Sequence, residues 1–239
     1  MAVTAGQIVA MGGGGLDPTS HLLEDFVVSL IPGQPARPRV CYVPTASGDP
    51  DAGIVRFYNA FPSDAYQPSH LNLFNRRVLD LDTFLHQQDV IYVGGGNTAN
   101  MLAIWRIHGV DRILREVLTA GVVLCGSSAG ALCWFEDGVT DSYGGHAPLG
   151  DGLGFLDGNY TPHWDSEPAR QAIFRELTQR SGRFGYATTD CAALHFKDGT
   201  LAEVVTSKPS AEAFLFEPGP SRPKETLLPH RYLGGDVAL

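Results

Sequence analysis

The sequence is poor in positive charge and lacks long apolar runs, and each shortage excludes a class of protein. Lysine and arginine number 17 against 26 aspartates and glutamates, which gives a formal net charge of −9 at pH 7. Binding to nucleic-acid phosphates needs a basic face, so this balance argues against a nucleic-acid partner. No apolar run is long enough to cross a bilayer, and residues 1–7 lack the pattern of an export signal. We therefore expect a cytoplasmic protein with no membrane partner.

Cysteine is also scarce, and its spacing excludes the common metal and redox motifs. The four cysteines are Cys41, Cys125, Cys133 and Cys191, none of them in Cys-x-x-Cys spacing. Three lie in or beside apolar runs, which favours buried thiols in a reducing compartment over disulfides or metal ligands. Histidines and carboxylates with His-Glu-x-x-His spacing are also missing from the sequence. We expect neither a metal nor a cofactor.

Length and composition indicate one soluble domain. The chain has 239 residues, of which 44% are hydrophobic and 18% charged, and its mean hydropathy is −0.04. These values are typical of a folded soluble protein. A sheet covered by helices on both faces uses a chain of this size without dividing. We expect a single domain over residues 1–239, with the proline-rich segment 217–239 as a weakly packed tail.

Short apolar runs alternate with longer amphipathic runs, which is typical of an α/β fold with a mostly parallel sheet and crossover helices. Residues 136–164 are rich in glycine and aspartate and predict a long loop, of a kind that is usually functional or mobile. Strands are expected at 8–11, 39–44, 70–74, 89–93, 122–125, 186–188, 192–196, 201–205 and 213–216, and helices at 20–30, 51–61, 98–106, 110–120 and 167–178.

The pentapeptide Gly126-Ser127-Ser128-Ala129-Gly130 has the pattern Gly-x-Ser-x-Gly and follows the apolar run 122–125. A strand that turns sharply into a helix through this pattern holds the central serine in a strained conformation with its hydroxyl exposed. Small residues also occupy many strand-to-helix turns for packing reasons alone. Ser128 is nevertheless the candidate nucleophile of this chain.

Two other predicted strands also end in glycine. Residues 12–15 are four glycines, and residues 94–97 read Gly-Gly-Gly-Asn. Because the carboxyl ends of parallel strands line one edge of a sheet, we expect these loops and Ser128 to meet at one crevice. A plain tight turn explains residues 12–15 equally well. For residues 94–97, the coincidence with Ser128 favours a functional loop.

A serine hydroxyl needs a base to remove its proton, and the base needs an orienting acid. Of the eight histidines, His146 and His163 lie in the segment expected to overhang the crevice. We favour His163, because Pro162 and Trp164 restrict its backbone and so hold the imidazole in one orientation.

The orienting acid has two candidates. Asp141 lies on a short strand-like run after the serine helix and can fold back to the crevice. Glu136 is expected to end that helix and is the second choice, although a solvated residue explains it equally well. Asp165 and Glu167 are close to His163 in sequence, which places them beside the ring rather than behind it. The sequence leaves the choice between Asp141 and Glu136 open.

Backbone N–H groups are needed to stabilise the oxyanion of an acyl-transfer reaction. Ala129 offers one N–H, and Gly95 or Gly96, next to Asn97, offers another. Arg170 lies near the start of a helix, where it is suited to bind a substrate carboxylate with both arms. Pairing of Arg170 with Glu167 or Glu176 on the surface is the alternative.

Three motifs in this order, residues 92–102, residues 126–131 and Pro162-His163-Trp164, resemble peptidase E, the α-aspartyl dipeptidase of the S51 serine peptidases, to which cyanophycinase is related. The similarity extends over residues 8–216. The resemblance implies a class I glutamine-amidotransferase-like fold, which is flavodoxin-like and doubly wound. It also implies Ser128 as nucleophile, His163 as base, Asp141 as the third member, and Arg170 as the residue that recognises an N-terminal aspartate.

The function that this resemblance implies is hydrolysis of Asp-X dipeptides through an acyl-enzyme, without a metal. The acid does not align with the family pattern without a gap, and the run 133–138 departs from that pattern. A cyanophycinase-like hydrolase of β-aspartyl peptides and a non-catalytic binding protein on the same fold are the alternatives. The expected partner is a small peptide substrate, and a homodimer is left open.

Overall fold

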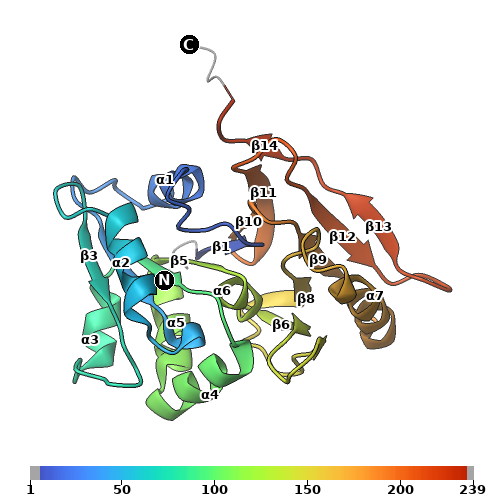
Figure 1. The fold of residues 1–239 in the computed structure, drawn as a ribbon, viewed down its shortest axis with the longest axis horizontal. Helices are drawn as coiled ribbons and strands as arrows, with labels where there is room; N and C mark the ends of the chain where they lie inside the picture. The colour runs from blue at the N-terminus through green and yellow to red at the C-terminus, as the bar shows by residue number, and fades with distance from the viewer. Residues whose placement is uncertain (1–5, 236–239) are drawn as a thin grey trace.

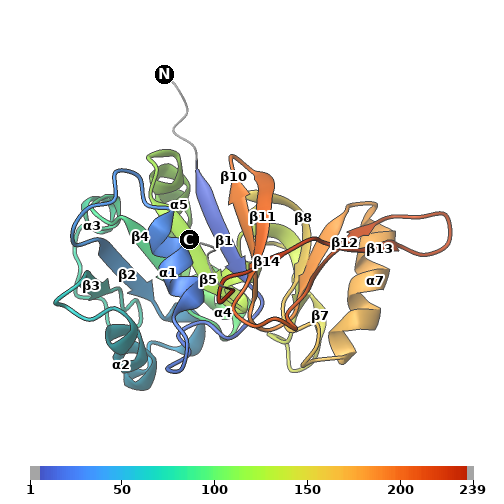
Figure 2. The ribbon, with the colours of Figure 1, turned by 90° about the horizontal axis from the view of Figure 1, so that it is seen from above.

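The structure is a computed structural model, which describes residues 6–235. Two sheets lie side by side, and helices pack on both (Figures 1 and 2). In spatial order, the larger sheet contains β14 (Arg231–Tyr232), β11 (Thr200–Thr206), β10 (Ala192–Lys197), β1 (Gln7–Met11), β5 (Val123–Ser127), β4 (Val90–Val93), β2 (Arg39–Val43) and β3 (Gln67–His70). The smaller sheet contains β13 (Lys224–Leu227), β12 (Ala213–Glu217), β9 (Gly185–Thr188), β8 (Leu156–Thr161), β6 (Phe135–Thr140) and β7 (Ala147–Pro148).

The larger sheet is parallel from β1 to β3 and antiparallel where β10 joins β1. Successive side chains of a strand point to opposite faces, so each strand contributes to two cores. Ile8 belongs to the core beneath α3 (Leu81–His86), α4 (Thr98–His108) and α5 (Val110–Thr119). Val9 belongs to the core beneath α1 (Leu22–Ser29) and α2 (Asp51–Ala60). The predicted coverage of the sheet on both faces is therefore present.

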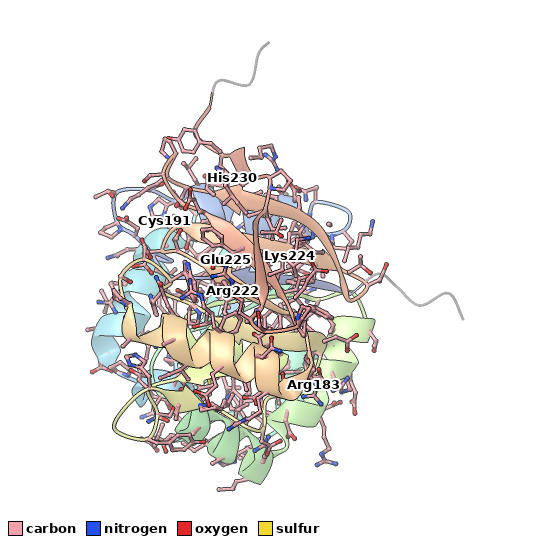
Figure 3. All side chains as sticks on the ribbon, turned by 90° about the vertical axis from the view of Figure 1, so that its right-hand side faces the viewer. Arg183, Cys191, Arg222, Lys224, Glu225 and His230 are labelled. Carbon is pink, nitrogen blue, oxygen red and sulfur yellow. The ribbon has the colours of Figure 1, made fainter. Side chains whose placement is uncertain are left out.

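The smaller sheet packs against the helix α7 (Ala169–Ser181). Trp164, Phe174 and Phe216 form the centre of a separate apolar cluster between them. Figure 3 views this side of the molecule, where Glu225 of β13 is labelled; its carboxylate lies 3.0 Å from the Arg175 guanidinium of α7. The second sheet is what the sequence analysis did not foresee.

The structure confirms the α/β class and corrects the expectation of one mostly parallel sheet. Residues 136–164, expected to be a loop, contain β7 and β8 and most of β6. The reason is that β6 and β8 carry polar residues and glycines, which weaken the alternating pattern, while pairing between them provides the missing stabilisation. The serine helix α6 is only Ala129–Leu132, so Glu136 lies on β6 rather than at a helix end.

Three smaller differences concern the ends of elements and the tail. The third strand is Gln67–His70 rather than 70–74, although Leu71 and Leu73 are buried just after it. The helix α3 was not expected. The segment after Glu217 contributes β13 to the smaller sheet and β14 to the larger one, yet most of its side chains are exposed. Among residues 6–235, no helix has both the length and the apolar character that crossing a membrane requires.

Candidate active site

Ser128 lies in a sharp turn between β5 and α6. Its backbone has φ 57° and ψ −113°, a conformation that costs energy for any residue other than glycine. The turn is tight because a Cβ on Gly126 would lie 2.3 Å from the Gly130 carbonyl oxygen, and a Cβ on Gly130 would lie 2.3 Å from that of Val93. The glycines of the Gly-x-Ser-x-Gly pattern are therefore needed for the backbones to approach each other.

His163 reaches this serine from the end of β8. Its Nε2 lies 2.8 Å from the Ser128 Oγ, within hydrogen-bonding distance. The peptide group between His163 and Trp164 is fixed at both of its polar atoms, since the Trp164 N–H donates to the Thr188 carbonyl oxygen and the His163 carbonyl oxygen accepts the Glu167 N–H. The structure thus places together the serine and the histidine that the sequence analysis selected.

The carboxylate on the other ring nitrogen is Asp190, which the sequence analysis did not consider. Its Oδ1 lies 2.6 Å from the His163 Nδ1. The hydrogen bond with His163 is the main reason why the pKa of Asp190 is lowered, and it outweighs the opposing effect of burial. The Asp190 N–H donates to the Asp165 Oδ1 at 2.9 Å, which fixes the turn that carries the carboxylate.

The geometry therefore corrects the expected third member. Asp141 is 59% exposed and its nearest cation is Arg170, 3.9 Å away. The Glu136 Oε2 accepts the Gly158 N–H at 2.9 Å and lies 3.5 Å from the Arg183 Nε. Neither carboxylate hydrogen-bonds to His163 within the described residues.

The signal that could have found Asp190 is its place after a strand. Ser128 follows β5, His163 follows β8, and Asp190 follows β9. Because β8 and β9 are parallel neighbours, their carboxyl ends lie at the same edge of the smaller sheet. That edge adjoins Ser128 at the corresponding edge of the larger sheet. Asp190, like the glycine loops, lies at the carboxyl end of a strand, but the sequence does not show that β9 pairs with β8.

The Gly12–Gly15 loop lies directly against the histidine and the aspartate. A Cβ on Gly13 would lie 2.1 Å from the Asp190 Oδ1 and 3.0 Å from the His163 Cε1. The Gly13 carbonyl oxygen also accepts the Cys191 N–H at 3.0 Å, which ties the loop to the turn that carries Asp190. The absence of side chains in this loop is therefore what makes room for the His163–Asp190 pair.

The Gly94–Asn97 loop lies on the other side of Ser128. A Cβ on Gly95 would lie 3.7 Å from the Ser128 Oγ, and one on Gly96 would lie 2.3 Å from the Ala46 carbonyl oxygen. Asn97 caps α4 by accepting the Asn100 N–H at 2.8 Å, and its amide donates to the carbonyl oxygen of Ser142. Within residues 6–235, the backbone N–H groups of Ala129, Gly95 and Gly96 have no hydrogen-bond acceptor in the protein.

Arg170 is 3% exposed and already has partners in the protein. Its Nε donates to the Glu167 carboxylate at 2.7 Å, and its Nη1 donates to the Val139 carbonyl oxygen. The His146 Nε2 lies 2.8 Å from the same Glu167 oxygen, and His146 has no hydrogen bond to Ser128 within the described residues. Burial alone would raise the pKa of Glu167, but hydrogen bonds from His146 and Arg170 lower it. Pairing of Arg170 with Glu167, the alternative in the sequence analysis, is present, although the arginine is buried.

The thiols and the one group of described residues whose ligand atoms cluster take no part in the contacts among Ser128, His163 and Asp190. All four cysteines are buried and free. Asp82, His86 and Glu116 bring ligand atoms within 4.8 Å of one another, but all three residues are exposed and lie on α3 and α5. None of them is on a loop that carries Ser128, His163 or Asp190.

Comparison with known proteins gives one family and several relatives. The profile of peptidase family S51 matches residues 8–204. YgaJ of Bacillus subtilis (strain 168), described as an uncharacterized peptidase, is 45% identical over 233 residues, which cover 95% of this chain and 99% of YgaJ. Lmo0363 of Listeria monocytogenes serovar 1/2a, also described as an uncharacterized peptidase, is 28% identical over 155 residues, or 60% of this chain and 74% of Lmo0363.

Solved structures share the fold at low sequence identity. A crystal structure from Listeria monocytogenes EGD-e, whose description proposes a peptidase E protein, has a TM-score of 0.60 at 22% identity and covers 86% of this chain and all of its own. A peptidase from an acI-B1 Actinobacterium has a TM-score of 0.67 at 16% identity and covers 95% of this chain and 96% of its own.

Proposed function

Because this chain belongs to peptidase family S51, we propose that it is a serine-type peptidase with Ser128, His163 and Asp190 as its catalytic residues. The observation that carries the proposal is the continuous pair of hydrogen-bonding contacts, 2.8 Å from the Ser128 Oγ to His163 and 2.6 Å from His163 to Asp190. A nucleophile, a base and an orienting acid in this order are the requirements for acyl transfer.

The proton moves in a direction that the contacts define. The Nδ1–H of His163 donates to the Asp190 carboxylate, which leaves Nε2 as the acceptor for the Ser128 proton. Ser128 Oγ attacks the peptide carbonyl carbon as His163 takes that proton. The imidazolium then protonates the leaving amine, and an ester between Ser128 and the acyl group remains. Water hydrolyses this ester by the same route, with His163 again acting as base.

The negative charge on the carbonyl oxygen needs donors that are already in place. The Ala129 N–H begins α6 directly after the nucleophile, and Gly95 packs against the Ser128 side chain. We assign the oxyanion hole to the N–H of Ala129 together with that of Gly95 or Gly96. These N–H groups are free of protein acceptors within the described residues, as this role requires.

The substrate class that we propose is dipeptides with an N-terminal aspartate. The resemblance to peptidase E supports it, and so does the difference in distance between Arg170 and its two neighbouring carboxylates. Glu167 holds this arginine at 2.7 Å, whereas the exposed Asp141 is 3.9 Å away. A substrate carboxylate can take the place of Asp141 at the guanidinium without disturbing the contact with Glu167.

A single set of variants tests this function. Ser128→Ala should reduce hydrolysis of Asp-Ala by about three orders of magnitude or more, as loss of a triad serine does elsewhere. Ser127→Ala, one residue earlier in the same turn, is the matched control and should stay near native activity. Turnover by the Ser128 variant at the native rate would refute the assignment.

The same assay separates the alternatives. Ala-Ala and β-Asp-Ala offered beside Asp-Ala distinguish an α-aspartyl dipeptidase from a less selective peptidase and from a cyanophycinase-like enzyme. A fluorophosphonate probe labels only an activated serine, so absence of labelling would favour a non-catalytic binding protein. We also propose a cytoplasmic location, which the four free, buried cysteines support.

A further inference from the structure

One buried carboxylate that the triad does not use lies beneath the Gly12–Gly15 loop. Glu24, in the first turn of α1, is 1% exposed. Its Oε1 accepts the Leu16 N–H at 2.7 Å and the Tyr92 hydroxyl at 3.4 Å. A carboxylate is costly to bury, and burial raises the pKa of Glu24. Such a residue is retained in a core only where its hydrogen bonds are needed.

The packing of α1 against the sheet does not require the hydrogen bonds of Glu24. Leu23, Phe26 and Val27 of the same helix are buried against the larger sheet and hold the helix by apolar contact. A leucine in place of Glu24 would add to that contact rather than weaken it. The hydrogen bonds of Glu24 instead go to the loop after β1 and to β4. Its role is therefore tied to that loop.

The loop is in close contact with the residues of the proposed triad and with the residue before the nucleophile. A Cβ on Gly15 would lie 2.0 Å from the Tyr92 hydroxyl and 3.3 Å from the Ser127 Cβ, so the loop is held between β4 and the residue before the nucleophile. Its other end, at Gly13, contacts Asp190 and His163. Leu16 has φ 55°, a strained conformation that the Glu24 hydrogen bond helps to maintain.

We propose that Glu24 is a positioning residue of the triad, which fixes the Gly12–Leu16 loop so that Gly13 holds Asp190 and His163 in line with Ser128. The inference rests on the proposed function. A displacement of about 1 Å in such a supporting element costs on the order of 100-fold in rate. Loss of the Glu24 contact should therefore appear in kcat, with little change in KM, because no substrate atom meets this residue.

Three substitutions separate positioning from simple stability. Glu24→Gln keeps an oxygen acceptor for Leu16 and Tyr92 and should keep kcat within about threefold. Glu24→Asp withdraws the oxygen by one methylene, and Glu24→Leu removes it; each should lower kcat by about tenfold or more at an unchanged KM. Leu23→Ala, one residue away in the same helix, should lower the melting temperature through a cavity while leaving kcat near its native value below that temperature.

A spectroscopic signature completes the test. The proton between His163 and Asp190 should give a downfield imidazole resonance in the native protein and in Glu24→Gln, and this resonance should shift or broaden in Glu24→Asp. If Glu24→Leu does not fold, the Asp variant and the resonance still decide. Native kcat in Glu24→Asp, or an equal loss of kcat in Leu23→Ala, would overturn the proposal. Full activity in Ser128→Ala would instead overturn the proposed function, so the two failures remain distinct.

Discussion

Replacement of Asp190 by asparagine is the sharpest prediction, because it distinguishes the carboxylate that the structure selects from those that the sequence suggested. The asparagine amide can present its NH2 group to the His163 Nδ1, which then becomes an acceptor. The ring proton moves to Nε2, the atom that lies 2.8 Å from the Ser128 Oγ. In that tautomer His163 cannot take the serine proton.

The size of the effect follows from the geometry. The corresponding change in a well-studied serine protease lowers kcat by about 10⁴-fold. The Asp190 side chain is 36% exposed, so water can orient part of the ring population correctly. We therefore expect a loss of about 10³- to 10⁴-fold in kcat/KM for Asp-Ala, or about 4–5 kcal/mol of transition-state stabilisation.

The assay is release of alanine from Asp-Ala, measured beside the variants Asp141→Asn and Glu136→Gln. These controls remove the carboxylates that the sequence favoured and should stay within about tenfold of native kcat/KM, since neither hydrogen-bonds to His163. Labelling by a fluorophosphonate probe should slow in parallel with turnover in the Asp190 variant. A collapse of activity in either control, with Asp190→Asn near native, would refute the assignment.

Stability gives an independent check of the same contact. The pKa of Asp190 is lowered in the folded protein, so the folded state binds this proton less tightly than the unfolded chain. The stabilisation is present above the ordinary pKa of 3.8 and is lost as the pH falls through the folded value. The difference in unfolding free energy between native protein and Asp190→Asn should therefore shrink on acidification, as urea denaturation would show.

Three further predictions concern the surroundings of the triad. Gly13→Ala would place a Cβ 2.1 Å from the Asp190 Oδ1 and should lower kcat by about 100-fold. Gly145→Ala is the control, because a Cβ at that position would have no heavy atom within 4 Å, and it should keep the native kcat. An equal kcat in the two variants would contradict the role of the loop. Arg170→Lys should raise KM for Asp-Ala by about tenfold or more, because a lysine ammonium cannot bind Glu167 and a substrate carboxylate in the bidentate way that a guanidinium can. KM for Ala-Ala should stay close to native. Equal increases in KM for both dipeptides would indicate that Arg170 has only a structural role. Burial raises the pKa of Glu24, which faces His21, Tyr92 and Cys125. The stabilising contribution of Glu24 is therefore present below pH 4.5 and is lost as the pH rises through the pKa of the folded protein. As the pH rises over that range, Glu24→Gln should gain stability relative to the native protein in urea denaturation, and a constant difference would argue against the raised pKa.

Local chemistry made much of the fold predictable. The strands β1, β2, β4 and β5 are short apolar runs bounded by proline or glycine, and their ends differ from the predicted ends by only one or two residues. Gly109 and Gly182, both with positive φ, end the helices α4 and α7, as glycine commonly does. The strands β6 and β8 were missed, because their polar and glycine residues gain order by pairing with each other and with the neighbouring strands β7 and β9.

For the candidate site, the sequence by itself was enough to select Ser128 and His163, which the structure brings within 2.8 Å of each other. A glycine-flanked serine after an apolar strand and a histidine beside a proline are local patterns, which can be recognised without knowing how the strands pair. Only the tertiary structure brings Asp190 to His163, buries Arg170 on Glu167, and places the Glu24 carboxylate at the Leu16 N–H after the glycine loop. These three contacts depend on which strands pair and which loops meet. Contacts between residues that are distant in the sequence do not produce a periodic pattern in it.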